Sequence, residues 1–207
     1  DAAALTVDEN TTAVTTVTAT DADAGATQSY SISGGADQAL FSIDGATGVL
    51  IFNAAPDFEA PIDAGFDNVY EVTVQVSDGS LADTQAISIT VTAVNDNTPV
   101  ITSNGGGATG SVSIAENTSA VTTVTATDAD LPAQTLTYSI AGGADQALFS
   151  VNGATGVLSF NTAPDFEAPA DAGANNVYEV TVQVSDGSFA DTQAISMWDT
   201  SLQTLMF

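Results

Sequence analysis

Apolar and polar residues alternate over short stretches of this chain. Tyr70, Val72, Val74 and Val76 are separated by single polar residues, and residues 178–184 repeat the pattern. Because successive side chains of a strand point to opposite faces, this alternation predicts strands with one buried and one exposed face. No segment places apolar residues at helical spacing over a length that would pack as a helix, although residues 37–41 are compatible with a helical turn.

The first hundred residues contain seven such runs, and Gly, Asp, Asn and Pro residues separate them. Asp44-Gly45 and Asp78-Gly79 are typical turn dipeptides between strands. Seven short strands in about a hundred residues are typical of a β-sandwich. The expected strands are residues 5–7, 14–20, 29–32, 41–43, 49–52, 69–77 and 86–91.

The chain contains an internal repeat. Glu9-Asn10 recurs as Glu116-Asn117 at an offset of 107, and Tyr30 recurs as Tyr138 at an offset of 108. The repeat predicts two tandem units, residues 1–97 including a linker and residues 98–207. A divergent tail is expected from about residue 197, because the strand of residues 86–91 is not repeated beyond Ser196. A functional tail and an artefact of the chain end both stay open.

The charge is one-sided. The 207 residues include 26 Asp and Glu but no Lys, Arg or His, so the formal charge is −26. Charged residues are only 13% of the chain, about half the usual share, and 44% are apolar, which excludes a disordered acidic tail. The negative field disfavours nucleic acid and anionic membranes as partners, and the apolar runs are too short for membrane insertion.

Other features of the sequence limit the possible fold and location of the protein less strongly. There is no cysteine, so no disulfide framework is expected. The chain starts at Asp1 without a signal-like segment, which favours a processed product or a piece of a longer protein. The excess of carboxylates suits a saline or calcium-containing exterior, where ions screen the repulsion.

Six acidic or turn motifs occur along the first copy, and the first five recur in the same order in the second. At these motifs the chain resembles cadherin repeats, particularly the tandem cadherin-like repeats of large bacterial surface adhesins. The resemblance implies an all-β fold of two tandem seven-stranded Greek-key β-sandwiches, of cadherin or immunoglobulin-like type, up to about Ser196. In the first copy the motifs are Asp8-Glu9-Asn10, Asp21-Ala22-Asp23, Phe41-Ser42-Ile43-Asp44 with Thr47-Gly48, Asp57-Phe58-Glu59, Val76-Ser77-Asp78-Gly79 and Asn95-Asp96-Asn97 with Pro99.

The resemblance also implies that Ca²⁺ binds between successive repeats. The ligands carried over to this chain are Glu9, Asp57, Glu59, Asn95, Asp96, Asn97, Asp128, Asp130 and Asp186. Two incomplete sets remain at the chain ends. They are Asp21, Asp23 and Asp78, which need a preceding repeat, and Glu116, Asp165 and Glu167, which need a following linker.

The ligand chemistry agrees with calcium. Seven of the nine residues are carboxylates, and two carboxylates about 4 Å apart repel by about 4 kcal/mol at an effective dielectric constant of about 20. Two or three divalent ions would neutralise them, and an oxygen-only set selects a hard cation that accepts many ligands, which favours Ca²⁺ over Mg²⁺.

The chain departs from the family pattern at two positions. Ala93 stands where the linker usually has an acidic residue, which removes one ligand. The asparagine usual after the Asp-x-Asp motif is also absent, because Leu131, Pro132, Ala133 and Gln134 follow Asp130. Two ions and three ions therefore both stay open.

Structural roles compete with metal binding at each position. A single Asp in a loop is often only a turn former, whereas the recurrence of Asp57 with Glu59, and of Asp128 with Asp130, favours a metal. Tyr70 and Tyr178 are expected in the core, and Phe58 and Phe166 as wedges beside the sites.

The favoured function is calcium-stiffened extracellular adhesion or assembly by a secreted or cell-surface protein. The incomplete end sets favour either a piece of a longer array or copies that join head to tail into a filament. The expected partners are neighbouring repeats, other copies of the chain, and cell-surface or polysaccharide ligands.

Two other functions compete with adhesion as interpretations of the sequence. Catalysis is not expected, because without His, Cys, Lys or Arg only a carboxylate pair could act, and the acidic pairs recur at scaffold positions. A carbohydrate-binding module of a secreted polysaccharide-active or cell-surface protein is the alternative. It requires an exposed aromatic platform, for which Trp198, Phe66 and Phe189 are the candidates.

Overall fold

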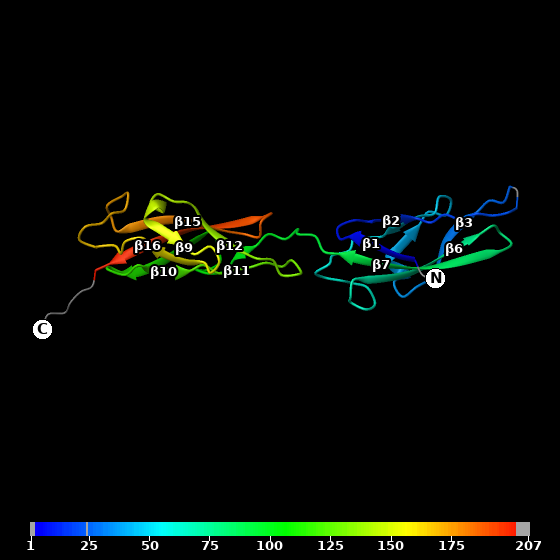
Figure 1. The fold of residues 1–207 in the computed structure, drawn as a ribbon, viewed down its shortest axis with the longest axis horizontal. Helices are drawn as coiled ribbons and strands as arrows, with labels where there is room; N and C mark the ends of the chain where they lie inside the picture. The colour runs from blue at the N-terminus through cyan, green and yellow to red at the C-terminus, as the bar shows by residue number, and fades with distance from the viewer. Residues whose placement is uncertain (1–2, 24, 202–207) are drawn as a thin grey trace. The chain divides into compact units, whose positions relative to one another are not determined.

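A computed structural model describes residues 3–23 and 25–201. The chain divides into two compact units, unit 1 (Asp1–Val94) and unit 2 (Asn95–Phe207), which are described separately (Figure 1). The boundary expected after residue 97 stays a prediction.

Unit 1 is a sandwich of two sheets. One sheet has the strand order β1-β7-β6-β3 and the other β2-β5-β4. β1 runs parallel to β7, whereas the other pairs in this unit are antiparallel. The strands are β1 (Ala3–Asp8), β2 (Ala13–Thr16), β3 (Ser29–Gly34), β4 (Phe41–Ile43), β5 (Val49–Phe52), β6 (Val69–Ser77) and β7 (Ala82–Thr92).

Unit 2 repeats this arrangement and adds one short pair. Its sheets have the orders β9-β16-β15-β12 and β10-β14-β13, and β8 pairs with β11. The strands are β8 (Val100–Ile101), β9 (Thr109–Ala115), β10 (Ala120–Thr123), β11 (Ala126–Thr127), β12 (Thr137–Gly142), β13 (Phe149–Val151), β14 (Val157–Phe160), β15 (Val177–Ser185) and β16 (Ala190–Thr200).

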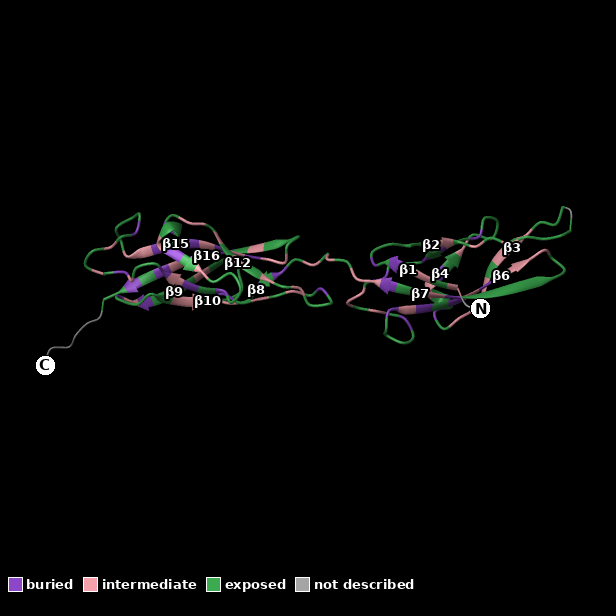
Figure 2. Cartoon of the chain, in the orientation of Figure 1, coloured by how far each residue is buried: buried purple, intermediate pink, exposed green. Residues whose placement is uncertain are grey.

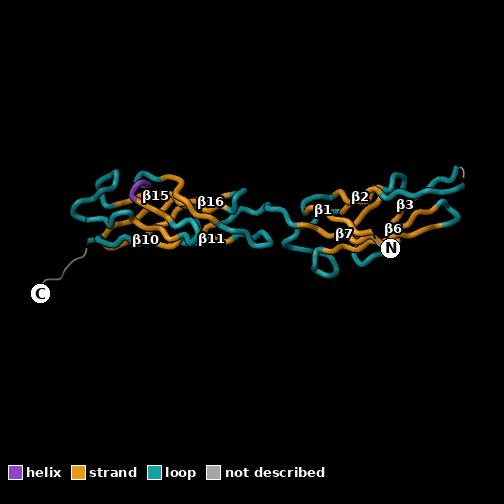
Figure 3. Tube along the Cα trace, viewed as in Figure 1, coloured by secondary structure: helices purple, strands orange, loops and turns teal. Residues whose placement is uncertain are grey.

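The all-β class and the two sandwiches are confirmed. Strands and loops make up almost all of the described chain (Figure 3). The only helices in that part are two 3-10 turns, η1 (Gln38–Leu40) and η2 (Gln146–Leu148), and η1 falls within the expected residues 37–41. None of the described residues forms a helix long and apolar enough to cross a membrane.

Two strands differ in length from the sequence expectation. β2 ends at Thr16, where residues up to 20 were expected, because the next backbone N–H, that of Val17, donates to Gly48 O in the turn before β5. β7 begins at Ala82, four residues earlier than expected, because polar Asp83 and Gln85 pair with β6 despite their lack of apolar alternation.

Each core contains inward residues that the alternation identified, such as Tyr70, together with buried residues outside those runs (Figure 2). Phe41, Phe52 and Tyr70 pack together in unit 1, where the Phe52 and Tyr70 rings meet edge to face with centroids 5.1 Å apart. Phe160 and Tyr178 repeat this contact in unit 2. Both tyrosines are 1% exposed, so their predicted place in the core is confirmed.

The extra pair in unit 2 explains why this unit has more than seven strands. Ile101 on β8 is 1% exposed, and its backbone N–H donates to Asp191 Oδ2 at 2.9 Å. Gln193 is fully buried below this segment, where its amide donates to Ser103 O and Gly107 O, whereas its unit 1 counterpart Gln85 is exposed. Val100 and Ile101 form too short an apolar run to be recognised as a strand from sequence.

The tail that begins at about residue 197 starts as part of the last strand. Met197 and Asp199 lie on the inner face of β16, 0% and 4% exposed, and Trp198 points outward. Asp199 occupies the position of Val91 in unit 1, which is 1% exposed. Neither carboxyl oxygen of Asp199 has a hydrogen-bond partner. Residues 202–207 of the expected tail lie outside the described residues.

Candidate metal centre

Glu9 anchors the acidic group of unit 1. Its side chain is 2% exposed, and its two oxygens accept the backbone N–H groups of Phe58 and Val94, each at 2.7 Å. Asn10 follows with φ 60°, a left-handed conformation that Asn adopts more readily than most residues. The Glu-Asn pair thus turns the chain at the end of β1 and directs the carboxylate toward two loops.

Asp57 and Glu59 complete this group. Carboxylate oxygens of Glu9, Asp57 and Glu59 lie within 4.8 Å of one another. Asp57 also caps its own loop, because its Oδ1 accepts the N–H groups of Glu59 and Ala60. Phe58, between them, is partly buried against the core, which agrees with its expected role as a wedge.

Two residues that hold this loop were missed by the sequence analysis. Asn68 donates from Nδ2 to Phe58 O at 2.9 Å. Asp63 is fully buried, and its carboxylate accepts the backbone N–H groups of Gly65, Asp67 and Asn68. Their recurrence as Asp171 and Asn176 at an offset of 108 was the available signal.

The acidic group of unit 2 combines three loops. Asp128 and Asp130 follow β11, and Asp186 follows β15, and their carboxylate oxygens lie within 4.8 Å of one another. Asp128 Oδ1 accepts Asp130 N–H at 3.1 Å, and Asp186 Oδ1 accepts the N–H groups of Ser188 and Phe189 at 2.6 and 2.7 Å. Each of these two residues therefore uses one oxygen to shape its turn.

The remaining oxygens of this group are buried and unpartnered. Asp128 Oδ2 and Asp186 Oδ2 have no hydrogen-bond partner, and Asn95 Oδ1 has none either. Buried polar atoms in folded proteins are almost always paired, so three in one group require an explanation.

The segment of Asn95, Asp96 and Asn97 is held by Asp130. Asp130 Oδ1 accepts from the backbone N–H groups of Asp96 and Asn97 and from Asn97 Nδ2. The Asn97 amide also donates to Asp96 Oδ1 at 2.9 Å. The Asn97 Nδ2 group therefore donates to two carboxylates, and the role of Asn97 as a ligand stays a prediction.

These hydrogen bonds keep the carboxylates ionised. Burial acts to raise the pKa of Asp130, but the donors from Asn97 and Asp96 outweigh it and hold that pKa below its usual value. Burial likewise opposes ionisation of Asp186, but the N–H groups of Phe189 and Ser188 hold its pKa below the usual value. The group is therefore anionic at neutral pH.

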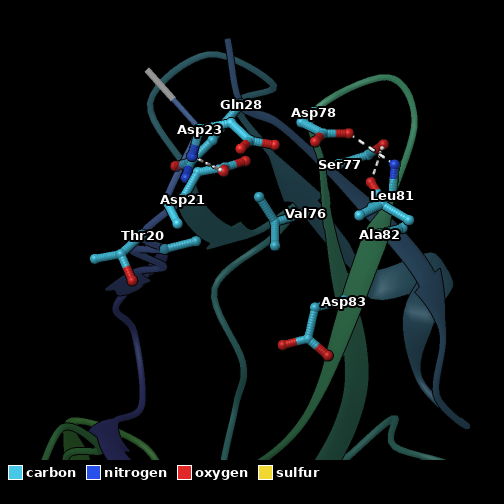
Figure 4. A pocket seen from close by; sticks show the side chains of 12 residues that line it. Thr20, Asp21, Asp23, Gln28, Val76, Ser77, Asp78, Leu81, Ala82 and Asp83 are labelled. Atoms are coloured by element: carbon cyan, nitrogen blue, oxygen red, sulfur yellow. Dashed lines mark hydrogen bonds between the residues drawn. The ribbon is translucent and has the colours of Figure 1, made fainter. Parts of the chain in front are cut away.

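The incomplete sets expected at the chain ends are also assembled. Asp21, Asp23 and Asp78 have oxygens within 4.8 Å of one another and line one pocket together with Gln28 (Figure 4). Glu116, Asp165 and Glu167 are equally close. The charge of Glu116 is the main cause that raises the pKa of Glu167, which is the repulsion a cation would relieve.

The structure thus sorts the nine predicted ligands by unit. Glu9, Asp57 and Glu59 gather in unit 1, and Asn95, Asp128, Asp130 and Asp186 in unit 2. Asp96 and Asn97 also belong to unit 2, where Asp130 accepts their backbone N–H groups. Whether the two groups share ions stays a prediction, as does the ion count left open by Ala93.

The donor sets fit a hard cation. They contain only carboxylate and amide oxygens, and bound Ca²⁺ accepts six to eight such ligands in flexible geometry. The three unpartnered oxygens of unit 2 are the observation that favours a cation at this group. Asn95, Asp128 and Asp186 would hold the ion with the atoms that lack hydrogen-bond partners. The ion would supply positive charge and cross-link three loops.

The three aromatic residues considered for carbohydrate binding are exposed. Phe66 is 75%, Phe189 40% and Trp198 51% exposed. They lie on different elements, namely the loop before β6, the turn between β15 and β16, and β16 itself. They do not form a repeated platform, because the matching residues of the other copy are not aromatic. Phe66 matches Ala174, Phe189 matches Leu81 and Trp198 matches Thr90.

Comparison with known proteins identifies the family. The profile described as Cadherin domain matches residues 4–93 and 110–197. The chain is 32% identical to Protocadherin Fat 1 of Homo sapiens over 94% of this chain and 4% of that protein, and 35% identical to Protocadherin Fat 4 of Homo sapiens over 74% and 3%. It therefore spans only a small part of these relatives.

Solved structures share the fold. Human Protocadherin-24 EC1-2 matches with a TM-score of 0.72 at 22% identity, over 95% of this chain and 93% of that one. Mouse Cadherin-23 EC22-24 matches with a TM-score of 0.71 at 21% identity, over 96% and 63%. These relatives are animal proteins, so the narrower resemblance to bacterial adhesins stays a prediction. The chain belongs to the cadherin domain family and contains two copies of that domain.

Proposed function

We propose that this chain is a calcium-binding extracellular module for adhesion or structural assembly, in which Ca²⁺ held between repeats stiffens the chain. The observation that carries the proposal is the set of unpartnered buried oxygens of Asn95, Asp128 and Asp186 in unit 2. A buried acceptor without a partner costs about 1–3 kcal/mol, and one cation would satisfy all three.

Chain continuity supports a shared site at the linker. Val94 donates its backbone N–H to Glu9 in the group of unit 1, and the next residue, Asn95, belongs to the group of unit 2. Ions held by both groups would fix the linker and turn a flexible pair of domains into a rod.

The end groups support assembly beyond two repeats. Asp21, Asp23 and Asp78 have the composition of the unit 2 group, and Glu116, Asp165 and Glu167 have that of the unit 1 group. Neighbouring repeats of a longer array, or copies joined head to tail into a filament, would complete them. The family and the charge of −26 support an extracellular place for such an array.

Calcium titration tests the proposal. Ca²⁺ added to chelator-treated protein should bind with measurable heat at about 10⁻⁴–10⁻³ M, the range of extracellular modules. The radius of gyration from small-angle scattering should increase, because the linker loses its bent conformations. Mg²⁺ at the same concentration is the control and should bind more weakly.

The two parts of the proposal fail separately. Absence of binding heat would contradict calcium binding at these groups. Binding without any change in the radius of gyration would leave calcium binding intact but contradict stiffening. Sedimentation with and without Ca²⁺ tests filament formation, which requires a concentration-dependent increase in mass.

Carbohydrate binding and catalysis are not proposed. The exposed aromatics Phe66, Phe189 and Trp198 give no repeated platform, and the family supports adhesion. The absence of catalysis stays a prediction from the composition.

A further inference from the structure

Gln134 joins two members of the unit 2 group that come from different parts of the chain. Its Nε2 donates to Asp130 Oδ2 at 3.1 Å, and its Oε1 accepts from Asn95 Nδ2. Asn95 lies 39 residues before Gln134, at the start of unit 2. The partly buried Gln134 amide is thus a bridge between the linker segment and the loop that follows β11.

The bridge fixes which way the Asn95 amide faces. An asparagine amide presents donors on one side and an acceptor on the other. With Nδ2 held by Gln134, Oδ1 is turned away from Gln134, and it is buried without a partner. Through Gln134, Asn95 is joined to Asp130, whose carboxylate lies within 4.8 Å of those of Asp128 and Asp186.

The same bridge fixes the Asp130 carboxylate. Oδ2 of Asp130 accepts from Gln134, and its Oδ1 accepts from Asn97 and Asp96. Donors on both oxygens hold the plane of the carboxylate, which is 2% exposed. Such a fixed ligand loses little conformational entropy when a cation binds.

Unit 1 lacks this device. Gln134 stands four residues before Tyr138, and the residue four before the matching Tyr30 is Ala26. The nearby Gln28 instead accepts from the Tyr30 hydroxyl at 3.3 Å. The matching Asp23 is exposed, whereas Asp130 is buried.

We propose that Gln134 is a positioning residue of the unit 2 calcium site, which presets Asn95 Oδ1 and the Asp130 carboxylate for the ion. The inference rests on the proposed function, because it assigns a role within that site. It also gives a physical role to the position where the family asparagine is absent. Gln134 touches the ligands and not the ion.

The test uses the full chain with Gln134→Met, which keeps the side-chain length but removes both hydrogen bonds. The calcium titration is followed by NMR at the backbone amides of Ser188 and Phe189, which donate to Asp186 and report this site alone. Gln134→Met should weaken binding about 10-fold or more, in the range for loss of an outer-shell partner. Gln85→Met, at an exposed glutamine outside the acidic groups, is the matched control and should leave the titration of these amides unchanged.

A second readout separates positioning from packing. Before calcium is added, the Asn95 side-chain NH₂ should show slowed hydrogen exchange in the original chain and fast exchange in Gln134→Met. The double variant Asn95→Ala, Gln134→Met should lose less affinity than the product of the two single losses, because both changes remove the same preset Asn95 ligand.

Three results would overturn the inference. These are unchanged affinity in Gln134→Met while the original chain binds Ca²⁺, fully multiplicative losses in the double variant, and equal hydrogen exchange at Asn95. None of them would affect the proposed function. Failure of the original chain to bind Ca²⁺ at Ser188 and Phe189 would instead contradict the proposed function itself.

Discussion

Replacement of Asp199 by Val should raise the thermal stability of unit 2 substantially. Asp199 is 4% exposed, both of its carboxyl oxygens lack partners, and its repeat counterpart is the core residue Val91. Val is close to Asp in size and removes the buried polar group. A gain of about 2 kcal/mol, within the range for an unsatisfied buried group, corresponds to a rise of about 8–16 °C in Tm for a domain of about 100 residues.

The size of this gain should depend on pH. Burial, followed by the nearby charge of Glu116, raises the pKa of Asp199 above its usual value. A raised pKa means that the folded state holds the proton more tightly than the unfolded state. The penalty for ionisation is therefore absent below the unfolded pKa of about 4 and is complete once the pH exceeds the folded value. The cost of burying the unpartnered neutral carboxyl remains at every pH. Asp199→Val should stabilise least at about pH 4 and most at neutral pH.

The measurement is thermal unfolding followed by fluorescence of Trp198, the single tryptophan, which reports unit 2. The reciprocal control is Val91→Asp, which should destabilise unit 1 with the same pH dependence. It is followed by differential scanning calorimetry, because unit 1 contains no tryptophan. An unchanged or lower unit 2 melting temperature for Asp199→Val at pH 7 would show that the carboxyl is not a source of instability.

The second large effect is expected at Asp128, where the sign should depend on calcium. Asp128→Asn keeps an oxygen to accept Asp130 N–H but removes one negative charge from the group with Asp130 and Asp186. Without Ca²⁺ the variant should be as stable as the original chain or more so, because repulsion falls. With Ca²⁺ it should be less stable, because a ligand is weakened.

The expected changes in stability follow from the coupling between calcium binding and folding. Removing an outer-shell partner of a metal site costs about 10–100-fold in affinity, and loss of a charged ligand should cost about 100-fold or more. A ligand at 100 times its Kd stabilises the folded state by about 2.7 kcal/mol. The original chain should gain about this amount at such a Ca²⁺ concentration, and Asp128→Asn should gain little.

Calorimetry gives the affinity, and unfolding monitored by Trp198 with Ca²⁺ or with chelator gives the stabilities. Glu179→Gln is the control, because Glu179 is exposed on β15, belongs to no acidic group and carries the same charge. If Glu179→Gln lowers the calcium affinity as much as Asp128→Asn, the loss comes from the reduced overall negative charge. That result would contradict a calcium site at Asp128.

The parts of the fold that the sequence predicted are those with local signals. Apolar and polar residues alternate from Tyr70 to Val76 because one face of β6 is buried. This two-residue period can be recognised from the sequence alone. Repetition then identified the groups around Glu9 and Asp128, since the same turn chemistry occurs in both copies. β8 was missed because Val100 and Ile101 are too few to show a period.

The sequence by itself determined the two-sandwich fold and the acidic residues at the strand ends, because period, turn residues and charge are properties of neighbouring positions. The tertiary structure alone decided that Asp199 is buried without a partner and that Gln134 bridges Asn95 and Asp130. The Gln134 bridge connects residues 39 positions apart, and the burial of Asp199 follows from packing of β16 into the core. No local pattern encodes which distant side chains meet.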